Sequence, residues 1–97
     1  MRIKTVKLPG KNHTVPREIA PFITDLKQVV GVQRMGYGEF IYKGSCRSLG
    51  AEVRHYNETT RTLRVRVNSP EFQKIIFLTI DPKQRASIER FVENYEF

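Results

Sequence analysis

The sequence predicts an α+β fold: a mostly antiparallel sheet of about four to five strands with two amphipathic helices packed on one face. The run 61–67 alternates apolar and cationic residues, which is typical of a strand with one buried side. Segments 51–56 and 74–80 are also predicted strands. Apolar residues recur at helical spacing over 19–30 and again over 88–95, which indicates the two helices.

Length and composition indicate one domain over residues 1–97. The chain has 97 residues, of which 39% are hydrophobic and 28% charged, enough for one modest core. No apolar run approaches the roughly 20 residues that span a bilayer, so we expect no membrane partner. Cys46 is the only cysteine and residues 1–8 lack the apolar core of a signal peptide, so we expect a cytoplasmic protein.

The first half of the chain is predicted to contain a strand, a helix and a broken strand. Residues 2–8 alternate loosely, and a loop over 11–14 leads to the helix. Pro21 is tolerated only in a first helical turn, so the helix either begins near Glu18 or is kinked, and Gly31 ends it. Its apolar stripe consists of Ile19, Phe22, Ile23, Leu26, Val29 and Val30. A short strand over 32–35 is expected to break at residues 36–38. Residues 40–42 either resume it or form the next strand, and a loop is expected over 43–50.

The second half is predicted to contain three strands and the last helix. Residues 74–80 are apolar on both faces, which favours a central position or one under a helix. Asp81 is the expected N-cap of the last helix, with Pro82 at its first position. The apolar stripe of this helix consists of Ile88, Phe91, Val92 and Tyr95.

The charge is high and unevenly placed. The net charge is +7 and the isoelectric point about 9.9, which favours anionic partners. Residues 1–66 hold 13 Lys and Arg against 5 Asp and Glu, whereas residues 67–97 hold 4 against 5. We therefore expect a basic patch in the first two thirds of the chain.

Pairing 51–56 with 62–67 predicts where the patch lies. If apolar faces match, Val53 pairs with Val65 and Ala51 with Val67. The opposite face then carries three pairs: Glu52 with Arg66, Arg54 with Arg64, and Tyr56 with Thr62.

The Arg54–Arg64 pair would be unfavourable by up to about 1 kcal/mol and relieved by a phosphate. We therefore expect Arg54, Arg64 and Arg66 to contact an anion, with Tyr56 stacking on a base of a single-stranded target. The alternative is that these arginines are solvated and that their stems cover apolar surface.

Two loops are predicted to extend this surface. Lys43 and Arg47 flank a segment rich in glycine and serine, whose donors suit phosphate, although an ordinary solvated loop fits equally. Lys11 lies just before the first helix, where free N–H groups favour an anion, although a plain capped loop fits as well.

Metal and thiol chemistry are weaker hypotheses. His13, His55 and Cys46 are the only imidazole and thiol ligands, and their spacing matches no metal motif. The predicted register turns His55 inward, which favours a core histidine. Cys46 lies near Lys43 and Arg47, which would lower a thiol pKa. Since no catalytic motif is present, we expect no enzyme and no cofactor.

The sequence therefore predicts a small basic protein that binds nucleic acid through phosphate contacts, with DNA and RNA both open. One alternative is an interaction module that binds an acidic partner or forms a homodimer through a sheet edge. A small metal-binding protein is the other.

Overall fold

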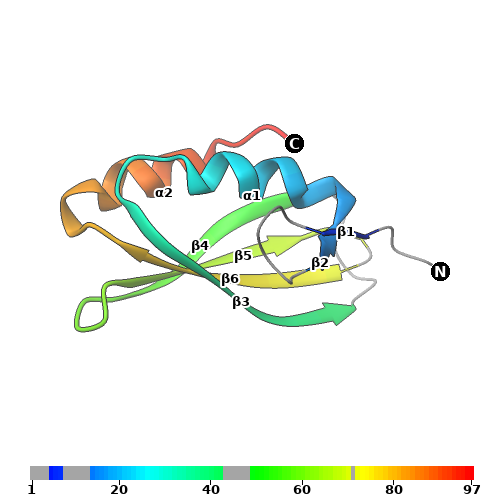
Figure 1. Ribbon diagram of the computed structural model, residues 1–97, viewed down its shortest axis with the longest axis horizontal. Coiled ribbons are helices and arrows are strands. Elements are labelled where there is room, and N and C mark those ends of the chain that lie inside the picture. The colour runs from blue at the N-terminus through cyan, green and yellow to red at the C-terminus, as the bar shows by residue number, and fades with distance from the viewer. Residues whose placement is uncertain (1–4, 8–13, 43–48, 71) are drawn as a thin grey trace.

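The computed structural model describes residues 5–7, 14–42, 49–70 and 72–97. The elements follow in the order β1 (Thr5–Lys7), β2 (Thr14–Pro16), η1 (Arg17–Ile19), α1 (Ala20–Lys27), β3 (Val32–Tyr42), β4 (Gly50–Asn57), β5 (Thr62–Asn68), β6 (Phe72–Ile80), η2 (Pro82–Gln84) and α2 (Arg85–Glu93). Figure 1 shows α1 and α2 on the same side of the large sheet. The predicted α+β fold is confirmed.

The large sheet has four antiparallel strands in the order β3-β6-β5-β4. Strands β4, β5 and β6 follow one another as neighbours, whereas β3 pairs with the other side of β6. The chain therefore crosses from one edge of the sheet to the other between β3 and β4 (Figure 1). The central position expected for 74–80 is confirmed in β6. Strands β1 and β2 form a separate pair, and β2 was not predicted because three residues are too few to show alternation.

The predicted break at residues 36–38 is wrong, because β3 is one strand of 11 residues. The pairing of β3 with β6 shifts register twice, between Val32 and Arg34 and between Tyr37 and Phe40, and the strand continues through both shifts. At Gly38 an added Cβ would lie 3.1 Å from Cε2 of Phe77. The missing side chain at Gly38 therefore lets β3 and β6 lie close together, and this glycine does not mark a turn.

The first helix begins as a 3-10 turn, and Pro21 lies in the first turn of α1, as expected. Gly31 has a positive φ of 97°, which suits glycine, but it lies beyond the C-cap Gln28, so the prediction that Gly31 ends the helix is wrong. The helix ends earlier than predicted, at Lys27. Val30 therefore lies beyond the helix and is 74% exposed, so its inclusion in the apolar stripe is wrong.

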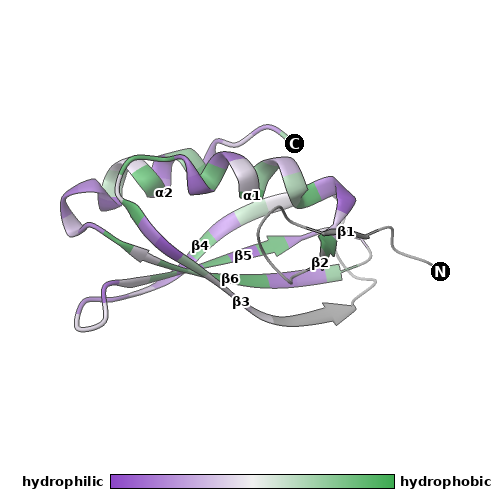
Figure 2. Cartoon of the chain, viewed as in Figure 1, coloured by the Kyte–Doolittle hydropathy of each residue, from purple (hydrophilic) through white to green (hydrophobic). Residues whose placement is uncertain are grey.

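The start of the last helix follows its prediction, but the helix ends at Glu93, so Tyr95 of the predicted stripe lies beyond it. Oδ1 of Asp81 accepts a hydrogen bond from the Lys83 backbone N–H at 3.0 Å, the expected capping contact. A 3-10 turn then leads into α2, where Ile88 and Val92 are buried. Figure 2 shows hydrophobic and hydrophilic residues mixed along both helices, as amphipathic helices require. Among the described residues, no helix is long and apolar enough to cross a membrane.

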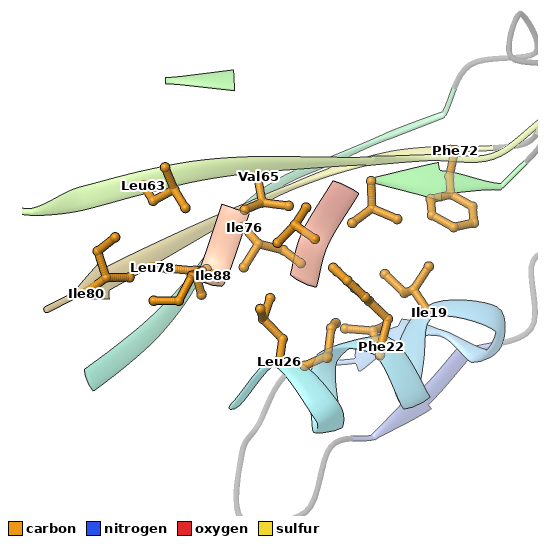
Figure 3. Packing of buried hydrophobic residues seen from close by; sticks show 14 residues of the cluster. Ile19, Phe22, Leu26, Leu63, Val65, Phe72, Ile76, Leu78, Ile80 and Ile88 are labelled. Atoms are coloured by element: carbon orange, nitrogen blue, oxygen red, sulfur yellow. The ribbon is translucent and has the colours of Figure 1, made fainter. Parts of the chain in front are cut away.

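The core lies between the helices and one face of the sheet. Side chains of Phe22 and Leu26 from α1 point toward Ile76 and Leu78 of β6, with Val65 of β5 beside them (Figure 3). The fully buried set also includes Val15, Ile19, Ile23, Leu63, Val67, Phe72, Ile80, Ile88 and Val92. Because α1 and α2 lie on the same side, the opposite face of the sheet carries no helix from the described part of the chain (Figure 1).

Candidate nucleic-acid interface

We call the side of the sheet opposite the helices the outer face. The strand registers place on it the residues that alternate with the core positions. Its members near the centre of the sheet are Arg34, Gly36, Glu52, Arg54, His55, Thr62, Arg64, Arg66, Ile75, Phe77 and Thr79.

The pairing predicted for one half of β4 and β5 is confirmed. Ala51 pairs with Val67, Val53 with Val65, and Glu52 with Arg66. The first two pairs contribute to the core side, and the third lies on the outer face.

Beyond Val53 the register shifts by one residue, so the predicted Arg54–Arg64 pair is wrong. The shift is a β-bulge in which Arg54 has no partner on β5, and His55 lies opposite Arg64 instead. The like-charge pair that we expected to be relieved by a phosphate is therefore absent from this register.

The bulge also exchanges the faces of two side chains. Tyr56 pairs with Leu63 rather than Thr62 and packs against the core, with Cζ of Arg85 4.3 Å from its ring centroid. The prediction that Tyr56 shares a face with the arginines is wrong, because the extra residue reverses the alternation. His55 is exposed opposite Arg64, so the prediction of an inward histidine is also wrong.

Glu52 lies between two arginines of the outer face. A guanidinium nitrogen of Arg66 donates a hydrogen bond to Oε1 of Glu52, and Nη1 of Arg54 lies 3.9 Å from the same oxygen. Nε of Arg66 is buried and has no hydrogen-bond partner in the described structure. The carboxylate therefore neutralises part of the positive charge at this end of the face.

Arg64 lies on the same face without such a partner. It is exposed, makes no ion pair with any described residue, and its Cζ lies 5.4 Å from the ring centroid of Phe77. This is the geometry of a cation–π contact. Beside the pair is a hollow of about 300 Å³, lined by His55, Asn57, Thr60, Thr62, Arg64 and Phe77.

The turn between β4 and β5 shapes one wall of this hollow. Oδ1 of Asn57 accepts hydrogen bonds from the backbone N–H groups of Thr59 and Thr60, at 2.9 and 3.1 Å. The hydroxyl of Thr62 donates to the carbonyl oxygen of Thr60 at 3.3 Å. Arg61 completes the turn with a φ of 56°. These bonds hold the turn in a defined shape.

Arg34 is an outer-face cation that sequence reasoning missed. It pairs with Thr79, is exposed, and forms no ion pair within the described residues. A second hollow, of about 340 Å³, adjoins it and includes Lys27 among its lining residues. The expected strand break at 36–38 hid this residue, since a continuous strand would have placed Arg34 and Gly36 on one face.

One lysine does not contribute to this surface. Lys74 lies opposite Val67 on the core side of β6, is 7% exposed, and has its Nζ 5.7 Å from the ring centroid of Tyr37. Burial lowers the pKa of Lys74 and raises the pKa of Tyr37. The usable charge of the outer face therefore comes from its arginines.

Other predicted site residues lie outside the described residues, namely Lys11, Lys43, Arg47, His13 and Cys46. Their contribution to binding, to a metal site or to thiol chemistry stays a prediction. Within the described ranges, no three side chains of His, Cys, Asp or Glu come together as a metal site would require.

Comparisons of the chain with protein-family models, with curated proteins and with solved structures found no match. The site is therefore interpreted from its own geometry.

Proposed function

We propose that this protein binds nucleic acid, with phosphate groups contacting the outer face of the sheet. The observation that carries the proposal is the gathering of arginines on the one sheet face that the helices leave free. Arg34 and Arg64 supply exposed guanidinium groups from β3 and β5, and Arg54 supplies a third from β4.

The chemistry of these groups suits phosphate. A guanidinium group remains charged at every physiological pH and donates paired hydrogen bonds that match phosphate oxygens. Arg34 and Arg64 lie on opposite sides of β6, so an extended polyanion crossing the sheet would meet both. Arg66 and Arg54 are partly neutralised by Glu52 and would contribute less.

Salt dependence of binding tests this proposal. The probes are labelled RNA and DNA oligonucleotides, single-stranded and as duplexes, titrated over a range of salt concentrations. The variant Arg34→Gln/Arg64→Gln should bind more weakly and lower the slope of log K against log salt by about 1.4 to 1.8.

The matched control is Arg17→Gln/Arg90→Gln, which removes the same charge from exposed residues of the helical layer. It should change the slope by much less than the outer-face variant. Wild-type affinity that does not depend on salt, or equal losses in the two double variants, would overturn the proposal.

A homodimer formed through a sheet edge receives less support. Strand β3 is a long edge strand, but its two register shifts are a common means by which edges avoid pairing. The mass of the protein in solution separates the two proposals, since a dimer through β3 would be seen without nucleic acid.

A further inference from the structure

Phe77 is an aromatic residue on the outer face and not part of the core. It lies on the central strand β6 and alternates with the buried residues Ile76 and Leu78. Its side chain is only partly buried, and its ring has the Arg64 guanidinium nearby. The ring therefore lies beside Gly38 and the Arg64 guanidinium on the cationic face, where part of it can be reached from outside.

The neighbouring strand leaves room beside this ring. Gly36 of β3 is the direct partner of Phe77, and a Cβ added at Gly36 would have no atom within 4 Å. Its φ is also ordinary, so neither backbone conformation nor close packing requires glycine there. Glycine inside a strand weakens it, and one established use is the close approach of a ligand to the backbone.

The hollow on the other side of the ring has polar walls. Thr60, Thr62 and His55 line it together with Phe77. Its volume of about 300 Å³ lies at the small end of ligand sites. A flat heterocycle with polar edges fits such a combination of one ring and several hydrogen-bonding groups.

From these observations we infer that the outer face takes a single-stranded polynucleotide, with one base stacked on Phe77 and the adjoining phosphate on Arg64. The inference rests on the proposed function and names its substrate class. In a duplex each base is already stacked between its neighbours, so no base face is free to stack on Phe77. Stacking is available in both single-stranded RNA and single-stranded DNA, because every base has a π-face.

Two variants test the stacking. Phe77→Leu keeps an apolar side chain but removes the ring. Gly36→Val keeps the ring and places a β-branched side chain beside it, in space that is open. The control for the second variant is Gly50→Val, since Gly50 also has open space, on edge strand β4 opposite Asn68, away from Phe77. Circular dichroism and thermal unfolding establish that each variant folds.

The probes are oligouridylate, oligothymidylate, an abasic strand of the same length and a duplex of that length. Wild-type protein should bind the single strands more tightly than the duplex and the abasic strand. Phe77→Leu and Gly36→Val should each lose about tenfold in single-strand affinity, since the first removes the stacking ring and the second blocks the space beside it. Gly50→Val should bind like wild type, and the salt slope should be the same in all four proteins.

Failure of this inference is distinct from failure of the proposed function. Equal binding of single strand, duplex and abasic strand, or unchanged affinity in both Phe77→Leu and Gly36→Val, would overturn the stacking while salt-dependent binding remained. An absence of salt-dependent binding to every probe would overturn both.

Discussion

Arg64 and Phe77 are direct partners on adjacent strands, and the guanidinium carbon of Arg64 lies 5.4 Å from the Phe77 ring centroid. The register between β5 and β6 fixes this pair, because Val65 and Leu63 on either side of Arg64 are buried. The cation proposed to bind phosphate and the ring proposed to stack on a base are therefore held together by the same pairing that builds the core.

Removing the Glu52 carboxylate should strengthen nucleic-acid binding. Glu52 lies beside both Arg66 and Arg54, so Glu52→Gln releases positive charge on the outer face. We expect tighter binding at low salt and a salt slope steeper by up to about 0.9, the value for one added phosphate contact. The cost in stability should be about 1 kcal/mol, because the ion pair is only partly buried and Gln can still accept a hydrogen bond from Arg66. Titrations at several salt concentrations and urea unfolding measure the two effects.

Glu89→Gln is the control for Glu52→Gln. Glu89 accepts a hydrogen bond from Nε of Arg85 at 2.6 Å within α2, on the helical side of the sheet. Glu89→Gln changes the net charge by the same amount as Glu52→Gln, but at a position away from the outer face. Equal gains in affinity from the two variants would contradict a local role for Glu52.

Gly31→Ala should destabilise the protein without affecting binding. Gly31 has a φ of 97°, and an added Cβ would lie 2.4 Å from Cβ of Gln84. We expect a loss of about 1 to 3 kcal/mol in the free energy of unfolding, which urea unfolding measures. Gly36→Ala is the matched variant, since its φ is ordinary and its surroundings are open. Equal stability of the two variants would contradict the account of Gly31.

The Tyr95–Asp25 contact should give stability that is lost at high pH. The Tyr95 hydroxyl donates a hydrogen bond to Oδ2 of Asp25 at 2.8 Å, which ties the end of α2 to α1. Burial, and then this hydrogen bond and the Asp25 charge, raise the pKa of Tyr95 above its ordinary value of 10.0. The folded protein holds this proton more tightly than the unfolded chain. The contribution is therefore fully present below pH 10.0 and is lost as the pH rises through the folded pKa.

Tyr95→Phe tests this contact. We expect a loss of about 1 kcal/mol at neutral pH. The difference in stability between wild type and variant should shrink above pH 10.0. Subtracting the two unfolding free energies at each pH removes the contributions of Lys74 and Tyr37, which are present in both proteins. A difference that stays constant with pH would contradict the assignment.

The sequence predicts the fold well where side-chain periodicity is regular. Strand β5, central strand β6 and the cap at Asp81 follow directly from alternation, from apolar residues on both faces and from an Asp–Pro helix start. The length of α1 is overestimated because Val29 and Val30 continue the helical spacing beyond the residue at which the helix ends.

The site is predicted less well, for two physical reasons. Alternation in β4 appears unbroken through Arg54, so no pattern reveals the bulge that brings His55 to the outer face and Tyr56 to the core. In β3 the glycines indicate a turn, whereas pairing with β6 holds them in a strand and places Arg34 on the outer face. Both features depend on contacts between strands, which one strand's own sequence does not contain.

We propose that nucleic acid binds at the outer face around Arg64, and this binding can be mapped residue by residue. The most direct measurement is a titration of isotope-labelled protein with single-stranded oligonucleotide, followed through its backbone amide NMR signals. We expect the largest changes in amide chemical shift at Gly36, His55, Arg64 and Phe77, with little change in α1 and α2. Shifts that concentrate on the helices while these four amides stay unmoved, or no shifts at all, would contradict it.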